Sequence, residues 1–124
     1  MSLEGFQVYA VLPASDYERA KAWYEEKLGL VPAEETGPNG WYRMADGTWF
    51  ILTLSGNAGT AKNTAAGFTV RDIGSVMADL RSRGVEFEDY PEMGTVDGLL
   101  SMGGYKAAWF TDSEGNIVEI SEVG

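Results

Sequence analysis

The residue best suited to chemistry in this chain is Glu119, which stands in a short apolar stretch near the C-terminus. Alternation over residues 116–120 predicts a strand with Ile117, Glu119 and Ser121 on one face, after a turn at 112–115. If that face looks into a cavity, Glu119 could bind a metal or act as a general base. If it looks into water, Glu119 is ordinary surface. The other residues on this face decide between these roles.

The sequence contains no histidine and no cysteine. It therefore lacks the commonest metal ligand and the commonest general base. It also lacks disulfides, thiolate nucleophiles and thiolate metal sites. A Ser-His-Asp or Cys-His catalytic relay is excluded for the same reason. Carboxylates, hydroxyl groups and aromatic rings are the groups that remain for a site.

The chain is strongly acidic, with nineteen Asp and Glu against nine Lys and Arg and a formal charge of −10. Such a field repels nucleic acid and anionic lipid, so we expect neither as a partner. The acidity either keeps the protein soluble or favours a cationic small molecule. No run of eighteen apolar residues is present, and the N-terminus lacks a signal-peptide pattern. We therefore expect a cytoplasmic protein.

Similar runs of predicted elements occur twice in the 124 residues, which are enough for one domain. Each run is a strand, a helix with an acidic or hydroxyl cap and a closing glycine, and then further strands. The first run has a strand at 6–12, a helix from a cap at Ser15 to Gly29, and a hairpin of strands at 41–45 and 48–55. The second has a strand at 67–70, a helix from Asp72 to Gly84, an extended stretch at 85–88, and a hairpin of strands at 105–111 and 116–121.

This repetition predicts an α+β fold of two modules, at about 5–55 and 65–122, joined by a polar linker at 56–64. Each module would bury one strand face beneath its helix and leave the other face open. Two open faces brought together form a concave cup, and ligand sites prefer such concavities. The second module also carries an insertion at 89–104, rich in Gly and Met. That segment either adapts to ligands or packs over a dimer interface.

Three stretches in register resemble the vicinal oxygen chelate superfamily, the group of glyoxalases, bleomycin-resistance proteins and extradiol dioxygenases. They are "ASDYERAKAWYEEKLGLV", "GFTVRDIGSVMADLRSRGVEF" and "AAWFTDSEGNIVEI". The resemblance covers nearly the whole chain. It implies paired βαβββ modules, an eight-stranded glyoxalase/bleomycin-resistance-like cup, and a homodimer.

The resemblance also implies four metal-ligand positions, which fall on Tyr9, on Thr53 or its neighbour Leu52, on Ala65 and on Glu119. Of these, Glu119 is the one that matches. Ala offers no donor, Thr a poor neutral one, and a Tyr phenol keeps its proton to a pH near 10. One carboxylate does not hold Zn²⁺, Fe²⁺ or Mn²⁺ against water. We therefore expect no metal and no other cofactor, and hence neither glyoxalase-type isomerisation nor ring-cleaving dioxygenation.

Strand alternation places a mostly apolar lining with a few hydrogen-bonding tips on the open faces, as in a small-molecule pocket. The expected ligand-binding residues are Gln7, Tyr9, Trp41, Trp49, Ile51, Thr53, Gly67, Trp109 and Glu119. Alternation does not decide whether Trp41, Trp109 and Tyr105 line the cup or pack in the core or a dimer interface.

Three functions remain open. The first is a metal-independent binding protein that sequesters a cationic or aromatic metabolite or antibiotic. The second is a lyase- or isomerase-type enzyme in which the apolar cup raises the pKa of Glu119 and makes it a general base, with Tyr9 hydrogen-bonded to it across the cup. The third is a regulatory or immunity partner that works through its dimer surface.

Overall fold

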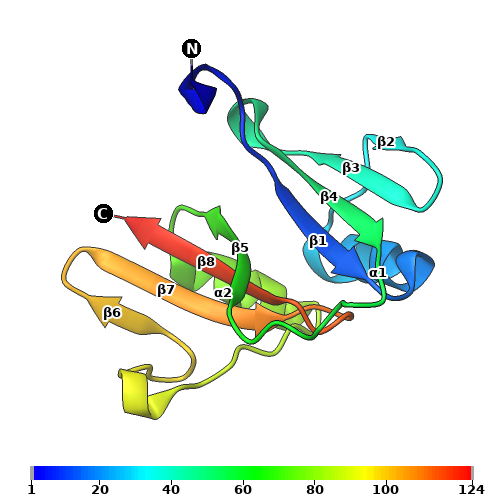
Figure 1. The fold of residues 1–124 in the computed structure, drawn as a ribbon. Helices are drawn as coiled ribbons and strands as arrows, with labels where there is room; N and C mark the ends of the chain where they lie inside the picture. The colour runs from blue at the N-terminus through cyan, green and yellow to red at the C-terminus, as the bar shows by residue number, and fades with distance from the viewer. Residues whose placement is uncertain (1, 124) are drawn as a thin grey trace.

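A computed structural model describes residues 2–123, and in it eight strands form two four-stranded sheets backed by two α-helices (Figure 1). Sheet A has the strand order β1-β4-β3-β2. Its strands are β1 (Ala10–Ala14), β2 (Glu34–Glu35), β3 (Asn39–Arg43) and β4 (Trp49–Leu54). β1 runs parallel to β4, whereas the β4–β3 and β3–β2 pairs are antiparallel.

Sheet B repeats this plan with the order β5-β8-β7-β6. Its strands are β5 (Thr64–Thr69), β6 (Leu100–Met102), β7 (Tyr105–Thr111) and β8 (Ile117–Val123). Again the first strand is parallel to the last, and the remaining pairs are antiparallel. The repeated connectivity confirms the predicted α+β fold.

The helices begin and end close to the positions that the sequence predicts. α1 (Tyr17–Trp23) continues as a π-helical turn (Tyr24–Leu28) and stops at Gly29, whose φ of 72° is left-handed. α2 (Ile73–Ser82) is capped by Asp72, whose carboxylate accepts hydrogen bonds from the backbone N–H and hydroxyl of Ser75. Gly84 takes a φ of 93° beyond its end. Both glycines therefore occupy conformations that a side chain would strain.

Three short 3₁₀ turns complete the described elements, at Leu3–Gly5, Ala45–Gly47 and Pro91–Met93. The second lies in the β3–β4 hairpin at the predicted Asp46–Gly47 turn, where both residues have positive φ. The longest described helix is too short and too polar to cross a membrane.

The predicted first strand begins too early. The strand spans Ala10–Ala14, and the residues before it lie along the surface, with Phe6 64% and Val8 89% exposed. Its pairing with β4 starts where Ala10 meets Phe50. Before Ala10 the described part of the chain has no neighbouring strand to pair with. The alternation pattern therefore predicted a longer strand than the one that forms.

The cap of α1 is Asp16 rather than Ser15. The Asp16 carboxylate accepts the backbone N–H of Arg19 at 3.1 Å, as a helix cap does. Ser15 instead donates both its backbone N–H and its hydroxyl to Glu114, a residue of the second module. Ser15 therefore pairs with a residue 99 positions along the chain instead of capping the helix.

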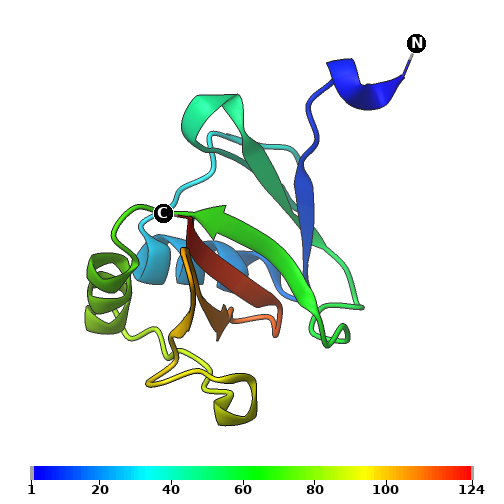
Figure 2. The same ribbon diagram turned by 90° about the vertical axis from the view of Figure 1, so that its left-hand side faces the viewer.

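One face of each sheet packs on its helix, and the two cores meet between the sheets. Trp23, Leu28 and Phe68 contact both hydrophobic clusters, and the rings of Phe50 and Phe68 lie 5.9 Å apart. Figure 2 shows α1 in the angle between the two sheets. Because the helix-covered faces converge, the open faces of sheets A and B point outward from one chain and do not oppose each other.

Candidate functional site

Three aromatic rings stack on the open face of sheet A. Tyr9 lies on Trp49 with 4.1 Å between ring centroids, and Trp49 lies on Trp41 at 4.9 Å with an angle of 14° between planes. β4 pairs with β3 so that Trp41 faces Ile51, which places it on the open side. We call Tyr9, Trp41 and Trp49 the aromatic stack. Tyr9 is 44% exposed, so the stack reaches the surface.

A cavity of about 390 Å³ adjoins the stack, and its lining includes polar side chains from three segments. The lining residues are Gln7, Glu34, Trp41, Arg43, Gly47 and Trp49. Among the described residues the indole Nε1 of Trp41 is buried and has no hydrogen-bond partner. Such a donor is costly to leave unpaired.

Ile51 and Thr53 extend this face along β4. Leu52 is fully buried in the core, so Thr53 is the member of the pair that faces outward. Its hydroxyl donates to the side-chain oxygen of Asn39 on β3. Ile51 is 8% exposed and forms an apolar floor beside the stack.

Glu119 lies on the open face of sheet B. It stands directly opposite Trp109 on β7 and Gly67 on β5. The hydroxyl of Tyr105 donates to Glu119 Oε2 at 3.0 Å. Burial and the adjacent carboxylate raise the pKa of Tyr105. Within one chain the hydroxyl donor to Glu119 is Tyr105, which lies on the neighbouring strand. The contact with Tyr9 across the cup stays a prediction.

The structure thus gathers the predicted ligand-binding residues into two sets. Gln7, Tyr9, Trp41, Trp49, Ile51 and Thr53 belong to the sheet A side, and Gly67, Trp109 and Glu119 to sheet B. Trp41, Trp109 and Tyr105, whose orientation the sequence left open, all occupy open faces. Tyr105 was not predicted as a site residue, because its contact with Glu119 depends on the β7–β8 register. That register could have been derived from the hairpin turn length.

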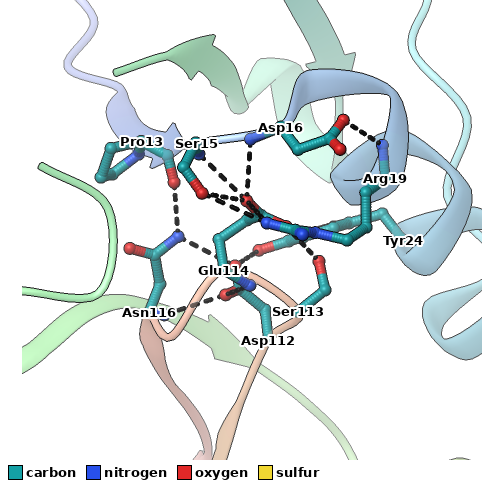
Figure 3. A network of polar contacts seen from close by, with 9 residues as sticks. All are labelled: Pro13, Ser15, Asp16, Arg19, Tyr24, Asp112, Ser113, Glu114 and Asn116. Carbon is teal, nitrogen blue, oxygen red and sulfur yellow. Dashed lines mark hydrogen bonds and ion pairs between the residues drawn. The ribbon is translucent and has the colours of Figure 1, made fainter. Parts of the chain in front are cut away.

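The strongest polar network of the described residues surrounds a different carboxylate, Glu114, in the β7–β8 turn (Figure 3). Its side chain is fully buried and accepts five hydrogen bonds from the start of α1. They come from the backbone N–H groups of Ser15 and Asp16, the Ser15 hydroxyl, and Arg19 Nε and Nη2, at 2.9–3.1 Å. These donors, above all the Arg19 guanidinium, lower the pKa of Glu114 to about 2.

A second carboxylate in the same turn, Asp112, makes a parallel set of contacts. It accepts the hydroxyl of buried Tyr24 at 2.7 Å and the backbone and side-chain N–H groups of Asn116 at 2.9 and 3.0 Å. Asn116 also donates to the carbonyl of Pro13 at 2.8 Å. Burial first, and then the charge of Asp112, raise the pKa of Tyr24 well above its usual range.

We call this network the clasp: Pro13, Ser15, Asp16, Arg19 and Tyr24 on the first module, and residues 112–116 on the second. The sequence predicted the turn but not these contacts, because the partner groups lie 88 to 103 residues away. The acceptor oxygens of Glu114 are already occupied by protein groups. The clasp therefore joins the two modules and offers little to a ligand.

The chain matches the Glyoxalase/Bleomycin resistance protein/Dioxygenase superfamily model over residues 7–120. It belongs to this superfamily. No curated protein matches the chain. Solved structures nonetheless share the fold of this glyoxalase-superfamily protein. A glyoxalase/bleomycin resistance protein from Catenulispora acidiphila is 22% identical, with a TM-score of 0.72 and coverage of 96% of this chain and 99% of the other.

Two further structural neighbours of the glyoxalase-superfamily protein are an antibiotic binding protein and a metal-bound resistance protein. TnmS3, an antibiotic binding protein from Streptomyces sp. CB03234, is 23% identical, with a TM-score of 0.68 and coverage of 94% and 93%. The fosfomycin resistance protein FosX from Listeria monocytogenes, complexed with Mn(II) and sulfate, is 13% identical, with a TM-score of 0.71 and coverage of 99% and 93%. At these identities the likeness establishes the fold alone.

A metal of the kind held by FosX does not fit the residues around Glu119. Its cross-strand neighbours are Trp109, which has no ligand atom, and Gly67, which has no side chain. Within residues 2–123, no group of three or more carboxylates is placed to hold a metal ion. Divalent cations need several N or O donors that converge on one point, and this face offers one carboxylate.

Proposed function

We propose that this glyoxalase-superfamily protein is a cytoplasmic homodimer that binds a small aromatic molecule with a cationic group, without a metal. The aromatic stack is the observation that carries the proposal. The three rings stack on one another, belong to neither hydrophobic core cluster and remain open at Tyr9. Stacking on such rings favours planar ligands, and the net charge of −10 favours cations.

The outward orientation of the open faces supports a dimer. One chain presents the aromatic stack on sheet A and Glu119 on sheet B, with α1 in the angle between the two sheets. A second copy could place its sheet B against sheet A of the first and close a cup over the ligand. The cup would then join the stack of one protomer to the Glu119 face of its partner.

Isothermal titration with 9-aminoacridine, a planar cation, tests the ligand class. Replacing Trp41 by Leu should weaken binding about tenfold or more. The stacking of one planar ring, such as a nucleobase, on an aromatic side chain is worth roughly 1–3 kcal/mol. Tyr9→Phe keeps the ring and serves as the matched control, with affinity unchanged within about twofold. Equal affinity of the Trp41→Leu variant would remove the stack from the binding site.

Two further measurements complete this test. Light scattering on the eluting protein should give the mass of a dimer, and a monomer that still binds 9-aminoacridine would refute the shared cup. Mass spectrometry of the ligand after incubation separates sequestration from catalysis. A product that disappears in Glu119→Gln would favour the enzyme over the binding protein.

A further inference from the structure

The open face of sheet B carries aromatic rings around one carboxylate. Trp109 stands directly opposite Glu119, and Tyr105, four positions earlier on the same face of β7, donates its hydroxyl to Glu119 Oε2 at 3.0 Å. Trp109, Tyr105 and Glu119 are all half-buried, so they are neither core nor fully solvated. On the other flank, Gly67 is exposed and has no side chain to cover the carboxylate.

A third ring comes from the inserted segment 89–104. Tyr90 packs edge-on against Trp109, with 6.1 Å between centroids and 71° between planes. Its backbone N–H donates to the hydroxyl of Thr95 at 2.6 Å, and that hydroxyl donates to Asp89 at 2.5 Å. Asp89 also accepts the N–H of Gly98 at 3.1 Å. The loop is therefore held by its own polar contacts, and Tyr90 is fixed beside Trp109.

No cation of the described residues pairs with Glu119. Every salt bridge within residues 2–123 involves another acidic group. Lys106 lies on β7 between Tyr105 and Ala107, but strand alternation directs it to the helix side, where it stands opposite Glu122. The Glu119 Oε1 atom accepts no hydrogen bond from the described residues, whereas Oε2 accepts the bond from Tyr105.

We propose that Glu119, Tyr105, Trp109 and Tyr90 form a site for a methylated ammonium group. The inference deepens the proposed function and rests on it, because this group would be the cationic end of the ligand. Aromatic rings attract a quaternary ammonium through their negative faces, and a nearby carboxylate adds charge complementarity. A primary ammonium brings three N–H donors, and this cluster has few free acceptors for them. A methylated ammonium needs fewer acceptors and fits the apolar ring surfaces.

Choline and its uncharged isostere 3,3-dimethylbutan-1-ol test the site, because they differ in charge and not in shape. The titration follows the indole N–H signal of Trp109 by NMR in the dimer at low salt. We expect choline to shift that signal and to bind at least tenfold more tightly than the isostere. Equal affinity of the two compounds would overturn the proposal.

Variants assign the interaction to individual groups. Isothermal titration measures choline affinity in the variants, because Trp109→Leu lacks the indole reporter. Glu119→Gln and Trp109→Leu should each weaken choline binding about tenfold. Lys106→Gln lies on the helix side of β7, outside the site, so choline affinity should stay within about threefold. A circular dichroism spectrum like that of the native protein excludes misfolding in each variant. Unchanged choline affinity in Glu119→Gln would also overturn the proposal.

The comparison with 9-aminoacridine separates the two proposals. If choline fails to bind while 9-aminoacridine still binds in a Trp41-dependent manner, the ammonium site is wrong and the proposed function stands. If choline binds and 9-aminoacridine does not, the ammonium site stands and the aromatic stack is not a ligand platform.

Discussion

Glu114 and Glu119 lie close together in the sequence, one in the β7–β8 turn and one in β8, yet their surroundings differ completely. Glu114 is fully buried and accepts hydrogen bonds from Ser15, Asp16, Arg19 and Ser113. Glu119 is half-buried and accepts one, from Tyr105. Donors that occupy every acceptor make a carboxylate structural, and a carboxylate with a free oxygen on an open face remains available to a ligand.

The same contrast holds for the surfaces on which the two residues lie. The clasp brings together groups that are distant in sequence and joins the first module to the second. The open faces carry aromatic rings that pack locally, within one sheet. We therefore expect substitutions in the clasp to change stability and substitutions on the open faces to change binding.

The largest effect should come from Glu114→Gln. The amide would turn a donor toward the backbone N–H groups of Ser15 and Asp16, and Arg19 would lose its charged partner. We expect a loss of roughly 2–4 kcal/mol of unfolding free energy and a decrease of about 10 °C in Tm, measured by urea titration and calorimetry. Glu119→Gln is the matched control and should leave Tm within about 2 °C. Equal losses in the two variants would remove the distinction between them.

Acid should lower the free energy of unfolding through the protonation of Glu114. The pKa of Glu114 falls from 4.5 to about 2 on folding, so the unfolded chain takes up this proton first. The contribution is therefore complete above about pH 4.5 and is lost as the pH falls toward 2. It is on the order of 2–3 kcal/mol. Urea titrations from pH 6 to pH 2.5 should show this slope in the native protein and a shallower slope in Glu114→Gln. Parallel slopes would contradict the assignment.

A smaller effect is expected at the Tyr24–Asp112 contact. Tyr24→Phe removes one buried hydrogen bond of 2.7 Å but keeps the ring packing against Trp23, Tyr42 and Phe50. The expected cost is about 1–2 kcal/mol, because Asp112 retains its bonds from Asn116. Tyr9→Phe, whose ring is partly exposed, should cost nothing measurable. A Tyr24→Phe variant as stable as Tyr9→Phe would show that this part of the clasp is dispensable.

Much of the fold follows from local patterns in the sequence. Gly29 and Gly84 end their helices because they alone take a left-handed φ there without strain. Alternation assigned Thr53 and Glu119 to open faces, as the structure has them. The turn at 112–115 was equally clear. These features depend on residues within a few positions of each other.

The tertiary structure decided what these residues contact. It replaced Ser15 by Asp16 as the helix cap because Glu114, far along the chain, claimed the Ser15 donors. It gave Glu119 the hydroxyl of Tyr105, since that contact depends on strand register. It also turned the open faces outward, because apolar contacts between the two cores draw the helix-covered faces together. Local alternation specifies which face a side chain occupies, whereas long-range packing specifies what that face meets.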